Sequence, residues 1–237
     1  MSNVIPESIA EQIIAEKIQE WNDNRKHVKQ SQTEAHHFVA ITRDFGCHEE
    51  EIIPRLEGAL GWRVYGKDLL NHLAEREELS RNFLETLDEK KQTQVDDWVN
   101  YLIHSGAVLQ KDYVLRITRL MEAIVRNENA ILLGRGANFI LKERKEGLRI
   151  KLTAPFDDRV KNIMEVRDLS LKEAEQLVRK NDKEREEFIS AYFNADSPTF
   201  SEFDLAFNTS VINTDLICET IKFVLQKKGF TTGGGSY

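Results

Sequence analysis

The sequence predicts an α/β protein built on a mainly parallel sheet with helices on both faces. Short apolar runs of strand length alternate with long amphipathic stretches of helix length along most of the 237 residues. This alternation is typical of parallel sheets whose crossover connections are helices. A composition with 41% apolar and 31% charged residues indicates a globular protein with a sizeable core.

Residues 1–35 are expected to form an N-terminal amphipathic helix and a linker. Apolar residues recur there at spacings of three to five, which places them on one helix face: Ile5, Ile9, Ile13, Ile14, Ile18 and Trp21. Pro6 suits the first turn, where its missing N–H is not needed. The apolar face either packs on the chain's own domain or mediates association, and a homo-oligomer formed through this helix is the alternative.

The main domain is expected over residues 36–228, followed by a flexible tail at 229–237. Strands are predicted at 37–42, 130–134, 148–153 and 204–208, with a weaker candidate at 62–65. Helical patterns cover 68–91, 94–128, 155–167 and 170–192. Because 68–128 holds too much helix for one crossover, we interpret it as a helical insertion.

Composition and charge exclude several classes of protein. The net charge is −7, with 40 acidic and 33 basic residues, which argues against non-specific binding to nucleic acid. No apolar run has the length of a membrane-spanning helix, and the first residues lack the apolar segment of a secretion signal. Two cysteines, Cys47 and Cys218, cannot build a disulfide framework, so we expect a cytoplasmic protein.

The segment after the first strand combines a favourable geometry with an unfavourable composition. A strand, a tight turn at Gly46 and a helix N-terminus can hold phosphate on backbone N–H groups. Three consecutive glutamates, 49–51, follow Cys47 and His48. Each carboxylate about 4 Å from a phosphate costs about 1 kcal/mol in water and about 4 kcal/mol at an effective dielectric near 20. The alternative is that these acids simply stabilise the helix N-terminus.

The segment Gly134-Arg135-Gly136 follows an apolar strand. Its glycines let the chain bend and place one guanidinium at the carboxyl end of the strand, where open α/β sheets bind ligands. Arg135 either offers its planar fork to phosphate oxygens or forms a surface ion pair.

Four arginines lie on the helices predicted over 155–192: Arg159, Arg167, Arg179 and Arg185. Asp182 and Arg185 are three residues apart and share a helix face. They form either an ordinary surface ion pair or part of a mobile lid whose arginines neutralise phosphate charge. The aromatic side chains are expected to be core rather than base-stacking residues, namely Trp62, Trp98, Phe188 and Tyr192. No metal site is expected, because the histidine and cysteine spacing matches no zinc pattern.

Together these segments resemble the cytidylate kinase-like family over residues 37–227. The resemblance is carried, in order, by ITRDFGCHEEEI (41–52), DEK (88–90), LLGRGANFIL (132–141), KLTAPFDDRV (151–160), DKER (182–185) and FDLAFNTS (203–210). It implies a three-layer P-loop NTPase-type fold with a nucleoside-monophosphate-binding insertion at 68–128 and a lid region at 155–192. It also implies transfer of the γ-phosphate of ATP to CMP or dCMP with Mg²⁺.

By the same resemblance, Arg135 binds the acceptor's phosphate, and Asp182 and Arg185 help hold the cytidine monophosphate. Arg159 and Arg185 are the candidate catalytic residues, Arg159 as a lid arginine that faces the phosphates. The ATP-binding loop corresponds to a degenerate segment whose candidate residues are Arg43, Gly46, Cys47, His48, Glu49 and Glu50.

The departures from the family pattern cluster in that loop. Ser, Gly, Gly and a basic residue are replaced by Cys47, His48, Glu49 and Glu50, and we expect His48 and Glu49 to resist the positive φ that glycine allows. Asn162 stands where a second lid arginine is usual, and Gly66 where Asp is common. Three hypotheses follow: a working kinase, a pseudoenzyme that binds a nucleotide without turnover, or a scaffold protein.

Overall fold

The structure is a computed structural model that describes residues 6–27, 36–193 and 200–230. Its centre is a five-stranded sheet in the order β2-β3-β1-β4-β5, and every neighbouring pair is parallel. The strands are β1 Phe38–Arg43, β2 Arg63–Tyr65, β3 Ala130–Leu133, β4 Gly147–Thr153 and β5 Leu205–Asn208. The helices are α1 Glu7–His27, α2 Glu49–Leu60, α3 Lys67–Glu75, α4 Glu77–Glu85, α5 Glu89–His104, α6 Asp112–Asn127, α7 Ala137–Ile140, α8 Phe156–Arg167, α9 Leu171–Tyr192 and α10 Thr214–Lys227, with a short 3-10 helix at Phe200–Glu202.

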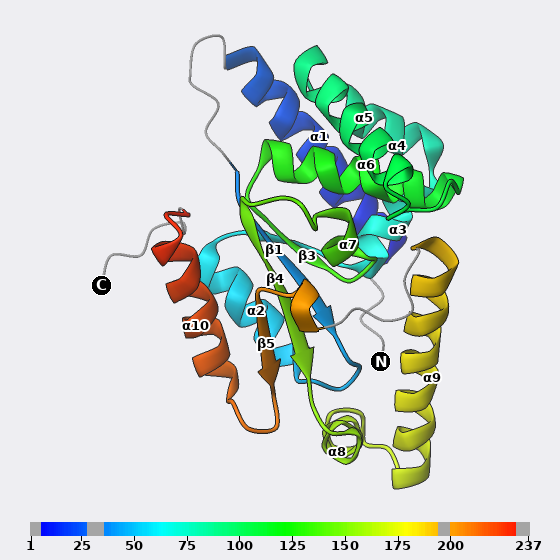
Figure 1. Cartoon of the computed structure of the whole chain (residues 1–237), viewed down its shortest axis with the longest axis vertical. Coiled ribbons are helices and arrows are strands. Elements are labelled where there is room, and N and C mark those ends of the chain that lie inside the picture. Colours follow the sequence, from blue (N-terminus) through cyan, green and yellow to red (C-terminus); the bar gives the residue numbers. More distant parts are fainter. Residues whose placement is uncertain (1–5, 28–35, 194–199, 231–237) are drawn as a thin grey trace.

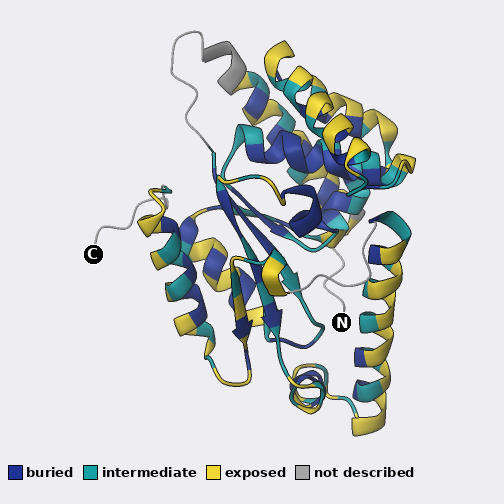
Figure 2. Ribbon diagram, in the orientation of Figure 1, coloured by how far each residue is buried: buried dark blue, intermediate teal, exposed yellow. Residues whose placement is uncertain are grey.

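The central strands β1 and β3 are buried on both faces, as their apolar runs predict. Successive residues of β1 point to opposite faces: Phe38 and Ala40 join a core shared with α1, α3, α4, α5 and α6. Val39 and Ile41 join a second core shared with α2 and α10. Figure 1 shows the sheet between these two layers, and Figure 2 shows that its strands are largely buried. The predicted α/β class with helices on both faces is confirmed.

The N-terminal helix α1 packs on the chain's own domain, against α3 and α4. Ala10, Ile14 and Trp21 are buried in the core, and the Trp21 ring lies 4.5 Å from that of Phe83. Lys17 forms a 2.6 Å ion pair with Glu128 at the end of α6. The apolar face of α1 thus packs on the chain's own domain, and association through this helix stays a prediction.

The segment between β2 and β3 consists of four helices, α3 to α6, as the expectation of a helical insertion requires. The stretch expected at 68–91 is divided into α3, α4 and the start of α5, with a break at Arg76, whose backbone is extended. The stretch expected at 94–128 is divided into α5 and α6. A bridge between Val108 and Phe193 joins the α5–α6 connection to the end of α9.

Helices α8 and α9 form a hairpin beyond the carboxyl end of the sheet (Figure 1). The hairpin has its own small core of Val160, Ile163, Ala174 and Val178, onto which Phe45 packs. Ser170 begins α9 with a capping box that includes Glu173.

The five predicted strands are all present, each within one or two residues of its expected bounds. Residues 1–5, most of the expected linker and positions 231–237 lie outside the described residues. None of the described helices combines the length and the apolar character needed to cross a membrane.

Candidate functional site

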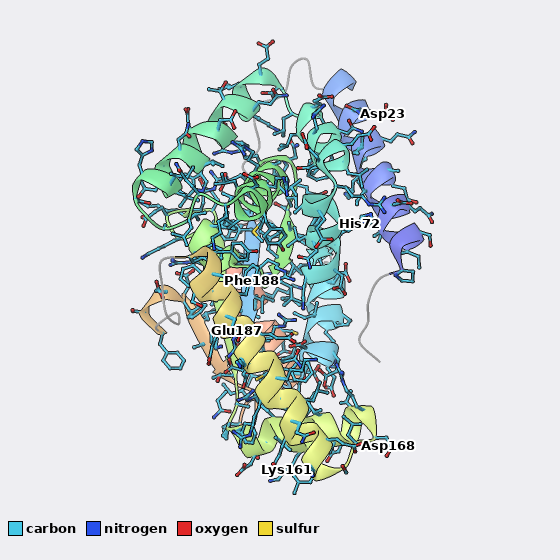
Figure 3. The ribbon with its side chains drawn as sticks, turned by 90° about the vertical axis from the view of Figure 1, so that its right-hand side faces the viewer. Asp23, His72, Lys161, Asp168, Glu187 and Phe188 are labelled. Carbon is cyan, nitrogen blue, oxygen red and sulfur yellow. The ribbon has the colours of Figure 1, made fainter. Side chains whose placement is uncertain are left out.

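A pocket of about 280 Å³ opens at the carboxyl ends of β1, β3 and β4. Parallel α/β sheets bind ligands at this edge because the loops that leave the strands meet there. The walls come from the end of β1, the start of α3, the Gly134–Asn138 turn, β4 and the last turns of α9. Figure 3 shows Glu187 and Phe188 on the part of α9 beside the sheet, whereas Lys161 and Asp168 lie at the opposite end of the α8–α9 hairpin.

Asp44, the residue after β1, is the centre of the charged network in this pocket. One carboxylate oxygen pairs with Lys151 of β4 and with Arg185 of α9, the latter at 2.9 Å. The other accepts a 2.6 Å hydrogen bond from Thr153. Burial alone would raise the pKa of Asp44, but Lys151, Thr153 and Arg185 together lower it below its ordinary value. The carboxylate is thus held ionised between two cations.

The pair Asp182 and Arg185 shares one face of α9, as their spacing predicts, at 3.1 Å. Arg185 also donates to the carbonyl oxygen of Arg43 at 3.1 Å. Asp182 accepts a second ion pair from Arg159 of α8 at 2.8 Å. The structure therefore brings the three candidate residues of the lid region into one network with the end of β1.

Helix α8 rests directly on the β1–α2 loop, which we define as residues 44–48. Arg159 is buried and donates to the carbonyl oxygens of Phe45 and Ala154. Asn162 donates to the carbonyl oxygen of Gly46 at 3.2 Å and to the Glu50 carboxylate at 3.0 Å. A Cβ atom at Gly46 would lie 2.8 Å from the carbonyl oxygen of Arg159. These contacts hold the loop and the hairpin together.

The backbone of the loop corrects one expectation. His48 adopts a left-handed conformation, with φ 54°, and Gly46 has φ 90°. The expectation that His48 resists positive φ is therefore wrong: histidine is among the residues found more often in this region, at a cost of about 1–2 kcal/mol. Glu49 avoids the problem because it is the first residue of α2.

The carboxylates that follow the loop, in the first turn of α2, have different partners. Glu49 forms an ion pair with Arg43 at 2.8 Å. The charges of these two candidate residues therefore offset each other. The Glu50 carboxylate accepts a hydrogen bond from the Asn162 amide, which is neutral and does not offset its charge. Cys47 is fully buried, and burial raises the pKa of its thiol to about 12, so it is not a thiolate nucleophile.

Arg135 lies in the pocket at the end of β3, between two glycines with positive φ. Arg135 itself has φ 50°, and its guanidinium stacks 4.5 Å from the centre of the Phe188 ring. Its Nε atom is buried without a hydrogen-bond partner, and no described carboxylate forms an ion pair with it. Burial lowers the pKa of this guanidinium. The alternative of a surface ion pair for Arg135 therefore finds no partner in the described chain.

The other arginines of the hairpin have different surroundings. Arg167 and Arg179 stack on the rings of Phe45 and Phe156 at 5.1 and 4.3 Å. Trp62 is buried, as expected. Phe188 is only half-buried and lines the pocket, so the expectation that it is a core residue is incomplete.

Sequence reasoning missed Asp44, Lys151, Asn138 and Lys67, all of which line the pocket. The sequence does contain a signal for two of them, Lys151 and its partner Asp44. Lys151 is one of the polar residues that alternate with Leu148, Ile150 and Leu152 along β4, and it is level with Thr42 at the end of the neighbouring strand. A lysine at that point of a buried parallel strand requires an anionic partner nearby.

The β1–α2 loop offers a triphosphate no lysine or arginine of its own. Glu50 stands where the family pattern has a basic residue. Arg159 and Asn162 donate to the carbonyl oxygens of Phe45 and Gly46, and Asn162 also donates to the Glu50 carboxylate. In the described ranges, no three His, Cys, Asp or Glu side chains are grouped to hold a metal ion. The pocket around Arg135, in contrast, offers an unpaired guanidinium.

Among solved structures, an uncharacterized protein from Eubacterium ventriosum matches with a TM-score of 0.58 and 21% identity, over 80% of this chain and 99% of that one. A shikimate kinase from Bacteroides thetaiotaomicron matches with a TM-score of 0.42 and 10% identity, over 81% and 98% of the two chains. The protein TT1252 from Thermus thermophilus matches with a TM-score of 0.45 and 19% identity, over 82% and 98%. No curated protein matches the chain.

The family comparison agrees with the resemblance carried by the motifs. The model of the cytidylate kinase-like family matches residues 38–211, which include the whole sheet and every residue of the charged network. The match extends from the first residue of β1 to just beyond β5. This chain, a nucleotide kinase-like protein with a parallel α/β sheet, therefore belongs to the cytidylate kinase-like family.

Proposed function

We propose that this protein binds a nucleoside monophosphate, CMP or dCMP, in the pocket around Arg135, and that it does not transfer phosphate from ATP. The observation that carries the proposal is a contrast between two positions at which the family pattern has a basic residue: one holds Arg135 and the other holds Glu50. The position at the acceptor side holds Arg135, with a buried Nε that has no described partner. The position at the donor side holds Glu50.

The chemistry of the pocket supports an anionic ligand of this size. The Arg135 guanidinium is already positioned by stacking on the Phe188 ring, so less side-chain freedom remains to be lost on binding. A guanidinium fork matches two oxygens of one phosphate. The volume of about 280 Å³ is close to the lower limit of small-molecule sites.

The other members of the network have supporting roles in the proposal. Every described contact of the Arg185 guanidinium uses the same atom, Nη1, which leaves its other N–H groups for a ligand in the pocket that it lines. Asp182 orients both Arg159 and Arg185. In this proposal Arg159 holds the β1–α2 loop against α8 rather than neutralising a transferred phosphate.

The proposal is tested by isothermal titration of the full chain with CMP, dCMP, cytidine and Mg-ATP. We expect CMP to bind, and Arg135→Ala to weaken that binding by about 10- to 100-fold, because charge-assisted hydrogen bonds of about 1.5–3 kcal/mol are lost. The matched control is Arg81→Ala, which removes an exposed arginine paired with Glu77 on α4.

Two results contradict the proposal. The first is equal CMP affinity of the wild type and Arg135→Ala, which would place the phosphate elsewhere. The second is micromolar affinity for Mg-ATP, which would favour the working kinase among the three hypotheses. An absence of binding to any of the nucleotides would favour the scaffold.

A further inference from the structure

The cations in the pocket fall into two groups. Five basic side chains line it: Arg43, Lys67, Arg135, Lys151 and Arg185. Three of them have carboxylate partners, because Arg43 pairs with Glu49 and the other two pair with Asp44. Lys67 and Arg135 form no ion pair with any described carboxylate. The wall also contains Glu184, which pairs with Lys180, and Glu186, both on α9. Lys67 and Arg135 are thus the two lining cations for which the described residues provide no ion pair.

Lys67 occupies an unusual position for a lysine. It is the first residue of α3, where the partial positive charge of the helix N-terminus makes a cation unfavourable by about 0.3–1 kcal/mol. The preceding residue, Gly66, has no side chain and provides no cap. An anion bound at this end of α3 would offset the unfavourable charge of Lys67 and would supply an acceptor for the free N–H groups of the first turn.

Arg135 lines the same pocket as the start of α3. After burial, the main influences on the pKa of its guanidinium are Tyr113 and two residues of α3, Asp68 and Glu75, which raise it. Neither carboxylate is within ion-pair distance of Arg135, so each compensates its charge only at longer range. The start of α3 and the Gly134–Gly136 turn thus border one pocket from two sides.

We propose that Lys67 and Arg135 form a two-cation clamp for the dianionic phosphate of a monoester, with Lys67 as the residue that selects the dianion. This inference rests on the proposed function, because it concerns the same pocket. Arg135 provides the buried, oriented contact, and Lys67 supplies a second charge at the rim. A phosphate diester carries one negative charge and gains less from the second cation.

The experiment compares titrations of the full chain with CMP, with the 5′-O-methyl phosphate ester of CMP and with cytidine. The variants are Lys67→Gln, Lys67→Arg and Lys172→Gln. Lys172 is a matched control because it is an exposed lysine in the first turn of another helix, α9, and does not line the pocket. Lys67 is exposed, so its substitution leaves the core intact.

For Lys67→Gln we expect CMP to bind about tenfold more weakly, as for the loss of one charge-assisted contact. The affinity for the methyl ester should fall by a smaller factor, so the variant should prefer CMP over the ester less than the wild type does. Lys67→Arg should keep most of the preference, and Lys172→Gln should match the wild type.

The outcomes separate this inference from the proposed function. If Arg135→Ala weakens CMP binding while Lys67→Gln leaves both affinities unchanged, the clamp is wrong and the proposed function stands. The clamp is also wrong if Lys67→Gln weakens CMP and the methyl ester by the same factor. If the wild type binds no CMP, both are overturned.

Discussion

Asp44 is the residue at which the ion pairs beside the carboxyl edge of the sheet converge. Its carboxylate contacts Lys151, Thr153 and Arg185, which come from β4 and α9. The two cations thus share one carboxylate inside the protein. Arg135 has no such anionic partner among the residues described, and this difference distinguishes it from Lys151 and Arg185.

The pKa of Asp44 leads to a prediction about stability and pH. Its partners lower the folded-state pKa below the ordinary value, despite burial, so the carboxylate stabilises the fold above about pH 4. That contribution is lost as the pH falls through the lowered pKa. We expect Asp44→Asn to reduce the free energy of unfolding at pH 7 by about 2–3 kcal/mol, since it leaves partly buried cations without their partner.

Urea denaturation between pH 7 and pH 2.5 measures this effect. The difference between the wild type and Asp44→Asn should shrink below about pH 4. Asp215→Asn is the control, because that exposed carboxylate pairs only with Arg55 at the surface and its loss should cost less than about 1 kcal/mol. A difference for Asp44→Asn that is constant over the whole range would contradict the assignment of a lowered pKa.

Among the elements, the β1–α2 loop and α8 are joined by close backbone packing and by side-chain hydrogen bonds. The loop bends at Gly46 with φ 90°, and the backbone of α8 approaches it so closely that a side chain there would meet the carbonyl oxygen of Arg159. Arg159 and Asn162 then bond the loop's own carbonyl groups. The element that resembles a lid is therefore fixed to the loop in this structure.

Two glycines close in sequence test this contact. We expect Gly46→Ala to lower the free energy of unfolding by about 2–4 kcal/mol, from the left-handed backbone and the overpacking against α8. Gly58→Ala in the exposed interior of α2 meets no atom within 4 Å and should raise it by about 0.5–1 kcal/mol. Thermal and chemical denaturation of the two variants measure the predicted loss and the predicted gain in the free energy of unfolding. A neutral Gly46→Ala would show that the loop and α8 are not in close contact.

The elements themselves were largely predictable from the sequence, because apolar periodicity reports burial directly. All five strands and both helices of the hairpin follow the pattern. The conformation of His48 was not predictable, since it depends on how α8 and α2 hold the loop. The break at Arg76 was also missed, because amphipathic spacing continues across it from α3 into α4.

For the whole molecule, the net charge of −7 is distributed unevenly around the site. Three glutamates, 49–51, begin α2, whereas Lys67 and Arg135 line the pocket without an ion pair to any described carboxylate. Arg135 and the Asp182–Arg185 pair could be anticipated from short-range spacing. The contacts of Asp44 with Lys151 and Arg185 could not, because they join residues far apart in sequence and depend on the strand order.

The central claim is that this member of the cytidylate kinase-like family binds a monophosphate without accepting phosphate from ATP. The most direct measurement is a coupled assay of ADP release, with ATP, Mg²⁺ and a panel of nucleoside monophosphates, on a preparation already shown to bind CMP. We predict no ADP release above that of the protein without monophosphate. ADP release that depends on CMP or dCMP, and that Arg135→Ala abolishes, would contradict the claim and identify a working kinase.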